Sequence, residues 1–162
     1  MSNEKFVAGI EYPRPFNKYV LSLCESASRY ICLLSPQLDH SVFDSADLVD
    51  ALSALARRSR QTQVRILISD SQTIVGRGHK LLLLAHRLPS TVRIQTLSEH
   101  PDWKGSTVVV RDTSGVLFKP AGSGNDAFYE PDSRASTRCH LELFEELWRC
   151  SVENPELRPL SI

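Results

Sequence analysis

The sequence has 162 residues, of which 41% are hydrophobic and 23% charged, and its formal net charge is +0. This length and composition predict one globular domain with a substantial core, and the balanced charge requires no bulk attraction to polyanions. No apolar run approaches the roughly 20 residues that span a bilayer, and the N-terminus lacks the apolar segment of a signal peptide. We therefore expect a cytoplasmic protein without a membrane span. Residues 1–15 contain two prolines and predict an irregular lead-in, followed by the domain over residues 16–162.

The first half of the chain alternates helical patterns with short apolar runs. Apolar residues at helical spacing predict an amphipathic helix over residues 16–28. The continuous apolar run at residues 30–34 is typical of a strand that is buried on both faces. Asp44 is expected to be the N-cap of the next helix, with Asp47 at its third position and Leu52 on its buried face.

The second half continues this alternation and then changes to a hairpin. Strands are expected at 64–69 and 92–97, with a helix over 74–88 between them. This order predicts right-handed crossovers and a largely parallel sheet. A turn at 113–115 between two β-rich segments predicts a hairpin over 107–118. The remaining segments are expected to be a polar loop at 98–106, a Gly/Asn/Asp-rich loop at 122–132, a last helix over 133–151 and an irregular tail that docks by Leu157 and Leu160.

The spacing of histidines and cysteines does not favour a metal site or a nucleophile pair. His79 and His86 are two helical turns apart, which is too far for one metal ion without a further element. Cys139 and His140 are adjacent, and adjacent residues of a helix point in different directions. We expect no metal and no cofactor, and we interpret the cysteines, which form no C-x-x-C motif, as reduced thiols. The cysteines are Cys24, Cys32, Cys139 and Cys150.

Two glycine-containing loops, Gly76-Arg77-Gly78 and Gly122-Ser123-Gly124-Asn125, can expose backbone N–H groups to a phosphate. Neither loop matches the dinucleotide-binding pattern or the Walker A pattern. A structural loop is therefore the main interpretation of both segments, and phosphate binding is the alternative.

Charge is distributed unevenly along the chain. Residues 57–93 contain eight basic residues against Asp70 as the one acidic residue, whereas acidic residues concentrate at 39–50 and 142–156. A basic face can bind the phosphates of nucleic acid or of a nucleotide. The favoured alternative is neutralisation within the fold or across a dimer, because the basic segment lacks interleaved aromatic residues that stack on bases. The candidate phosphate-binding residues are Arg58, Arg77, His79, Lys80, Ser123 and Asn125.

The order of elements resembles one half of a phospholipase D-like domain. The motifs FDSADLVDALSALARRSR, VRILISD, GHKLLLLAHRLPS, FYEPDSRAS and NPELRPL resemble more closely an uncharacterised phospholipase D-like domain. That domain is found alone in proteobacteria or attached to GNAT-type acetyltransferases. The resemblance covers the chain from about Tyr30 onward. It implies an α/β fold with a mixed, mostly parallel sheet, a bacterial source, a homodimer and an acetyltransferase as a partner.

Active members of the phospholipase D superfamily carry H-x-K-x4-D on such a hairpin, often followed by G-S-x-N. The histidine takes the phosphoryl group covalently and the lysine neutralises phosphate oxygens. If Asp112 is the motif aspartate, Gly105 and Thr107 occupy the histidine and lysine positions. Glycine has no side chain and threonine carries no charge, so neither residue can replace its counterpart. The G-S-x-N sequence at 122–125 also follows Asp112 by ten residues instead of seven.

The resemblance therefore implies a pseudoenzyme, a non-catalytic interaction or regulatory domain. We expect this domain to bind a phosphate-bearing molecule or nucleic acid, or to assist an acetyltransferase. The alternative is a diverged phosphodiesterase or nuclease with a rearranged site built from His100, Lys104 and Asp112. In that site the histidine and the lysine are four residues apart rather than two.

Overall fold

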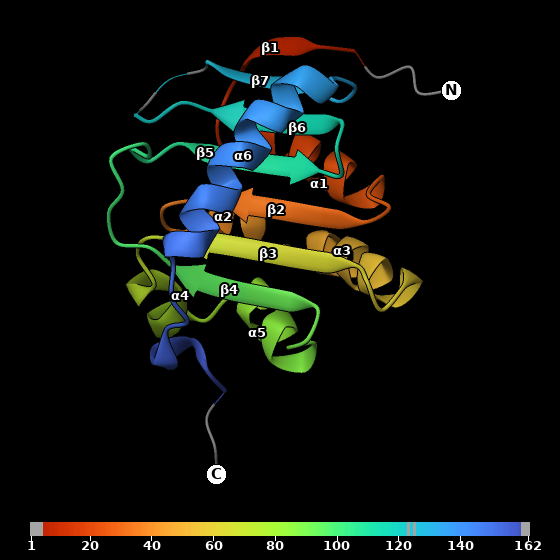
Figure 1. The fold of residues 1–162 in the computed structure, drawn as a ribbon. Helices are drawn as coiled ribbons and strands as arrows, with labels where there is room; N and C mark the ends of the chain where they lie inside the picture. The colour runs from red at the N-terminus through yellow and green to blue at the C-terminus, as the bar shows by residue number, and fades with distance from the viewer. Residues whose placement is uncertain (1–4, 123, 125, 160–162) are drawn as a thin grey trace.

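The computed structural model describes residues 5–122, 124 and 126–159. Its strands are β1 (Val7–Ile10), β2 (Tyr30–Leu34), β3 (Gln63–Ile68), β4 (Val92–Thr96), β5 (Thr107–Arg111), β6 (Gly115–Lys119) and β7 (Ala127–Glu130). They form one sheet in the order β1-β7-β6-β5-β2-β3-β4 (Figure 1). β2, β3 and β4 are parallel, whereas β5, β6, β7 and β1 continue the sheet with antiparallel pairing. The predicted α/β class with a mixed sheet is confirmed. The prediction that the sheet is mostly parallel is wrong, because β2–β3 and β3–β4 are the two parallel pairs and the four pairs that involve β5, β6, β7 and β1 are antiparallel.

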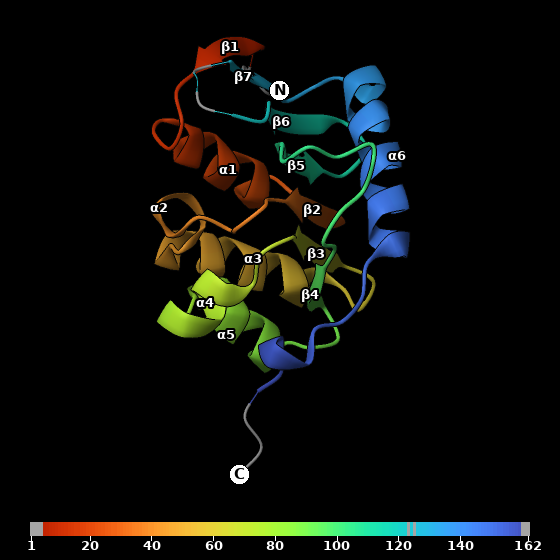
Figure 2. The ribbon, with the colours of Figure 1, turned by 90° about the vertical axis from the view of Figure 1, so that its left-hand side faces the viewer.

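The helices cover both faces of this sheet. They are α1 (Phe16–Glu25), α2 (His40–Phe43), α3 (Ala46–Arg58), α4 (Gln72–Arg77), α5 (Lys80–Arg87) and α6 (Arg134–Cys150), with a 3-10 turn η1 (Pro155–Leu157). The helices α1 to α5 lie on one face, and α6 alone crosses the other (Figure 2). Within the described part of the chain, no helix is long and apolar enough to cross a membrane.

The sheet separates two hydrophobic cores, and β2 contributes to both. Ile31 and Leu33 belong to the core under α1, α3 and α5, whereas Cys32 and Leu34 belong to the core under α6. All four side chains are almost fully buried. This alternation explains why β2 is apolar at consecutive positions, as predicted for a strand covered on both faces.

Arg65 of β3 joins α6 to the sheet. Its guanidinium lies 5.2 Å from the ring centroid of Phe144 and 5.6 Å from that of Trp148, and it pairs with Glu145. It also donates a hydrogen bond to Sγ of Cys32 at 3.4 Å. This basic residue therefore serves helix packing by cation–π and ionic contacts.

The N-cap of α3 is Ser45, whose hydroxyl accepts a hydrogen bond from the N–H of Leu48. The prediction that Asp44 caps this helix is wrong by one residue. Asp44 ends the short helix α2, so it lacks the extended backbone of an N-cap. Its carboxylate instead accepts a hydrogen bond from the N–H of Lys80, at the start of α5.

The helix predicted over 74–88 is two helices, α4 and α5. Gly78 ends α4 with a φ of +78°, and His79 follows in an extended conformation as the N-cap of α5. Nδ1 of His79 accepts a hydrogen bond from the N–H of Leu81 at 3.0 Å. The histidine therefore replaces the Ser, Thr, Asp or Asn that usually marks a helix start, so no usual capping residue indicated this break.

Two segments expected to be irregular contribute strands to the sheet edge. Residues 1–15 contain β1 and are therefore no irregular lead-in, and residues 122–132 contain β7. Each strand has four residues, which is too short to show a clear alternation. Leu157 of the tail is buried as predicted, whereas Leu160 lies outside the described residues.

The predicted hairpin is confirmed as β5 and β6. Its turn begins at Asp112, which adopts a φ of +50°. A Cβ atom on Gly115 would lie 2.8 Å from Nη2 of Arg111, whose guanidinium donates hydrogen bonds to Ser26 and to the carbonyl of Pro131. A glycine is therefore required where the hairpin returns.

Candidate functional site

The carboxyl ends of β2, β3 and β4 lie along one edge of the sheet, on the left of Figure 1. Because β5 is antiparallel to β2, its first residue reaches the same edge. Ligands of open α/β sheets bind outside the carboxyl ends of the strands. A cavity of about 720 Å³ opens here, lined by Ser69 after β3 and by residues 98–101 and 103–105.

The loop that forms most of this cavity is held by a buried tryptophan. Trp103 donates its indole N–H to the carbonyl of Ser106 at 3.0 Å and its backbone N–H to the carbonyl of His100 at 3.2 Å. Nδ1 of His100 accepts a hydrogen bond from the N–H of Asp102 at 3.0 Å. The loop therefore has a defined conformation, and it exposes Lys104 to solvent.

The charged groups of the cavity are few. Lys104 supplies a permanent positive charge and Glu99 a negative one, both exposed. His100 lines the same cavity, with its Nε2 atom 4.0 Å from a carboxylate oxygen of Glu146 on α6. The structure thus brings together two members of the rearranged site expected from the sequence, His100 and Lys104. An ammonium group suits a phosphate as a compact point charge.

The backbone is unusual at Gly105, the residue that the sequence comparison predicts at the histidine position of the phospholipase D motif. Gly105 has a φ of +102°, which favours glycine over any residue with a side chain. A Cβ atom there would meet Pro36 at 3.9 Å and Ala121 at 4.0 Å, so conformation rather than space restricts this position. Thr107, predicted at the lysine position, is 3% exposed and lies opposite Lys119 on β6.

Asp112 lies at the far end of β5, about 17 Å away by the rise of a five-residue strand. Its carboxylate accepts hydrogen bonds from the backbone N–H groups of Ser28 at 3.0 Å, Arg29 at 2.7 Å and Tyr30 at 3.0 Å. It thereby closes the loop between α1 and β2. The structure does not bring this aspartate to the cavity.

A second basic residue, Lys119, lies at the same edge and was missed by sequence reasoning. Its ammonium group donates hydrogen bonds to two carbonyls of the following loop, at 2.9 and 3.2 Å, and lies 4.9 Å from the ring centroid of Tyr12. The hydroxyl of Tyr12 donates to Asp39, and burial together with this carboxylate raises its pKa. Only the strand register brings Lys119 opposite Thr107.

Ser123 and Asn125, predicted to bind phosphate, lie outside the described residues.

Residues 12–160 match the family model of a domain of unknown function, DUF7931. The chain belongs to this family. None of the curated proteins matches the sequence.

Several solved structures share the fold of this DUF7931 chain. Nuc of Salmonella typhimurium, a phospholipase D family member, aligns with a TM-score of 0.64 and 18% identity over 96% of this chain and 100% of its own. NucT of Helicobacter pylori aligns with a TM-score of 0.57 and 12% identity over 93% and 98%. TrmBL2, an archaeal chromatin protein with a novel mode of DNA binding, aligns with a TM-score of 0.68 and 13% identity over 93% of this chain. The chain spans 54% of TrmBL2. These similarities establish a phospholipase D-like fold.

Two of the residues predicted to bind phosphate, His79 and Lys80, make contacts within the DUF7931 domain. His79 is 3% exposed, and its Nε2 atom lies 3.1 Å from the carbonyl of Leu38. Burial lowers the pKa of His79 to about 4, so its ring is neutral at physiological pH. The ammonium group of Lys80 pairs with Asp44 at 3.8 Å.

The other two described candidates, Arg58 and Arg77, are exposed but lie far from each other along the domain. The helix α3 ends at Arg58 just before β3 begins, whereas α4, which ends at Arg77, lies beside the carboxyl edge (Figure 1). Residues 57–93 therefore do not form one basic face. Three ion pairs connect this segment to the acidic regions, as internal neutralisation predicts: Arg65–Glu145, Lys80–Asp44 and Arg93–Glu153.

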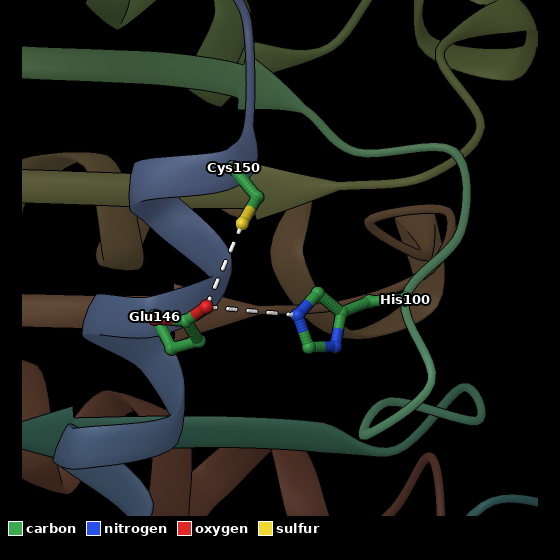
Figure 3. Close-up of side chains that lie close together, drawn as sticks. All are labelled: His100, Glu146 and Cys150. Atoms are coloured by element: carbon green, nitrogen blue, oxygen red, sulfur yellow. Dashed lines mark hydrogen bonds and ion pairs between the residues drawn. The ribbon is translucent and has the colours of Figure 1, made fainter.

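A group of metal-ligating side chains that the sequence did not predict lies beside the cavity. His100, Glu146 and Cys150 meet between the loop and α6 (Figure 3). Glu146 and Cys150 are one helical turn apart, which the helical pattern already implies. His100 is distant in sequence, and no local pattern connects it to α6.

Proposed function

We propose that this DUF7931 chain is a non-catalytic, phospholipase D-like domain that binds a phosphate-bearing ligand, in particular single-stranded nucleic acid. The observation that carries the proposal is the open cavity at the carboxyl edge, whose lining includes the exposed Lys104 and Gly105. The cavity offers a positive charge to a phosphate. The hairpin beside it lacks the histidine nucleophile and the lysine of an active phospholipase D motif.

The chemistry of the hairpin supports binding without hydrolysis. A phosphodiesterase of this fold needs a histidine to accept the phosphoryl group and a lysine to neutralise it. Gly105 has no side chain, Thr107 is buried and uncharged, and Asp112 is engaged with three backbone N–H groups. The alternative, a rearranged phosphodiesterase with His100 and Lys104, would have to work without this aspartate.

The size of the cavity and the exposed ammonium group of Lys104 support a ligand that carries phosphate, while Glu99 on the same wall carries the opposite charge. A volume of about 720 Å³ falls within the usual range for small-molecule sites and admits a nucleotide unit. Lys104 is exposed and forms no ion pair with any residue that the structure describes. It can therefore pair with a phosphate without breaking an existing contact. The description of TrmBL2 as a DNA-binding chromatin protein is compatible with this ligand class.

We further propose that two copies of the chain pair with their carboxyl edges facing each other. The resemblance to half of a phospholipase D-like domain motivates this arrangement, and light scattering on the purified protein tests it. A monomer at all concentrations would exclude pairing. Assistance to an acetyltransferase stays a prediction of the resemblance.

Binding to a fluorescently labelled single-stranded oligonucleotide at low salt tests the proposed ligand. Lys104→Glu replaces the positive charge of the cavity with a negative one, so we expect affinity to fall at least about tenfold. Affinity of the wild type should also fall with salt, since bound phosphates release counterions. Fluorescence anisotropy measures both effects.

The matched control is Lys5→Glu, which makes the same charge change at another exposed lysine. It should leave affinity within about twofold of the wild type. The variant Arg58→Glu should also bind normally, because α3 ends at Arg58 before β3 begins, at the opposite edge of the sheet from the cavity (Figure 1). Equal losses in all three variants would mean that binding is non-specific, and absence of binding at low salt would refute the proposal.

A further inference from the structure

Three side chains of the kinds that bind transition metals meet between α6 and the loop before β5 (Figure 3). Oε1 of Glu146 lies 4.0 Å from Nε2 of His100 and 3.7 Å from Sγ of Cys150. The three ligand atoms all lie within 4.8 Å of one another. One nitrogen, one oxygen and one sulfur atom thus surround a common point.

The helix holds its two ligands in a suitable orientation. Oε2 of Glu146 pairs with the guanidinium of Arg149, which leaves Oε1 directed toward the other two ligand atoms. The helix has 17 residues and is fixed to the sheet by the buried side chains of Phe144 and Leu147. The spacing between Glu146 and Cys150 is therefore set by a rigid element.

The loop fixes the third ligand. The side chain of His100 is 12% exposed, and its Nδ1 atom accepts a hydrogen bond from the N–H of Asp102. The carbonyl of His100 accepts a hydrogen bond from the N–H of Trp103, whose indole is buried. These contacts keep Nε2 directed toward α6.

We propose that His100, Glu146 and Cys150 bind a zinc ion, with water as the fourth ligand. Usual zinc bond lengths in a tetrahedron separate the ligand atoms by about 3.4–3.6 Å. The separations of 4.0 and 3.7 Å then shorten by about 0.6 and 0.1 Å, and the third, which is at most 4.8 Å, by up to about 1.2 Å, through side-chain rotations. The mixed N, O and S donors suit zinc, whereas magnesium and calcium prefer oxygen ligands alone.

The proton changes on binding are simple. Zinc takes the place of the proton on Nε2 of His100, and the neutral ring then carries its proton on Nδ1. The N–H of Asp102, an exposed residue, then donates to water instead of to Nδ1, and the hydrogen bond from the N–H of Trp103 to the carbonyl of His100 continues to hold the loop. The thiol of Cys150 releases one proton to solvent and binds as the thiolate.

Bound zinc would join the loop at 97–106 to α6. Since this loop forms most of the cavity wall, zinc occupancy would fix the position of Lys104. The site does not depend on the proposed function, because it is defined by its own three ligands and is measured by metal binding alone.

Zinc binding to the full chain, first stripped of metal with a chelator, tests the proposal. Equilibrium dialysis with metal analysis should give roughly one zinc ion per chain. Cobalt(II) used as a probe should add a thiolate-to-cobalt charge-transfer band. Cys150→Ser, Glu146→Gln and His100→Asn should each weaken zinc binding at least about tenfold, as expected for the loss of a ligand.

Cys139→Ser is the matched control, because Cys139 is also an exposed cysteine of α6 but lies outside the group. It should bind zinc and cobalt like the wild type. Circular dichroism verifies that each variant is folded, which the exposure of Cys150 favours. Absence of zinc binding, a charge-transfer band that survives Cys150→Ser, or loss of binding in Cys139→Ser would overturn the proposal.

Discussion

The two ends of strand β5 differ in how their polar groups are used. At one end Asp112 accepts three backbone hydrogen bonds and closes the loop between α1 and β2. At the other end Gly105 borders an open cavity in which Lys104 is exposed. The carboxylate of Asp112 therefore serves the fold, while Lys104 at the open end is available to a ligand.

The comparison separates residues that stabilise the fold from residues available to a ligand. A carboxylate that satisfies backbone donors is costly to remove, because those donors lose a charged acceptor. The exposed ammonium group of Lys104 contributes little to stability, because it forms no ion pair with the residues that the structure describes. Substitutions at Asp112 should therefore change the stability of the fold, whereas substitutions at Lys104 should change ligand binding.

The largest effect is expected at the closed end. Asp112→Ala removes the acceptor of three N–H groups and places alanine at a φ of +50°, so we expect a loss of about 3 kcal/mol in the free energy of unfolding. Urea denaturation measures this loss. Asp102→Ala, an exposed aspartate near the open end, should change stability by less than about 0.5 kcal/mol. Equal stability of the two variants would contradict the comparison.

The second-largest effect on stability is expected at His79, because this side chain is buried whereas that of Lys104 is exposed to solvent. The pKa of His79 is about 4 in the folded state and about 6.5 in the unfolded chain. Below pH 6.5 the unfolded state binds a proton that the folded state does not. Stability should therefore fall by about 2 kcal/mol between pH 7 and pH 5 from this group.

The pH effect is isolated by comparison with His79→Asn, whose side-chain oxygen can still accept from the N–H of Leu81 but does not titrate. Denaturation at pH 7 and pH 5 should show a smaller pH dependence for the variant. If both proteins lose the same stability, the ring of His79 is not kept neutral by the fold.

A smaller effect is expected at the open end itself. Gly105→Ala should destabilise the domain by about 1 kcal/mol, because its φ of +102° is unfavourable for a residue with a Cβ atom. Gly76→Ala is the control, since Gly76 lies within α4 and alanine is the better helix former. A neutral or stabilising Gly105→Ala would show that a side chain, including the motif histidine, is acceptable at this position.

The elements with strong local patterns were predictable from the sequence. The strand β2 and the hairpin follow from runs of apolar and β-branched residues, and both are present. The four-residue strands β1 and β7 were missed because such short segments show no clear period. The break between α4 and α5 was missed because His79 acts as a helix cap only through its tertiary contact with Leu38.

The candidate site was predictable only in part. Sequence motifs indicated the hairpin and the change at Gly105 and Thr107, since these depend on spacing along one strand. They did not indicate that His100 meets α6, or that Lys119 lies opposite Thr107, because both follow from strand order and loop conformation. The run of basic residues at 57–93 offered a basic face as its less favoured interpretation, and the fold divides these residues between two edges.

The fate of a bound oligonucleotide tests the central claim most directly. End-labelled single-stranded DNA is incubated with an excess of wild-type protein at low salt, and its binding and its length are measured in the same sample. We predict that the DNA is bound and is recovered at full length. DNA that is shortened by the wild type but not by His100→Ala, or DNA that is not bound at all, would contradict this account.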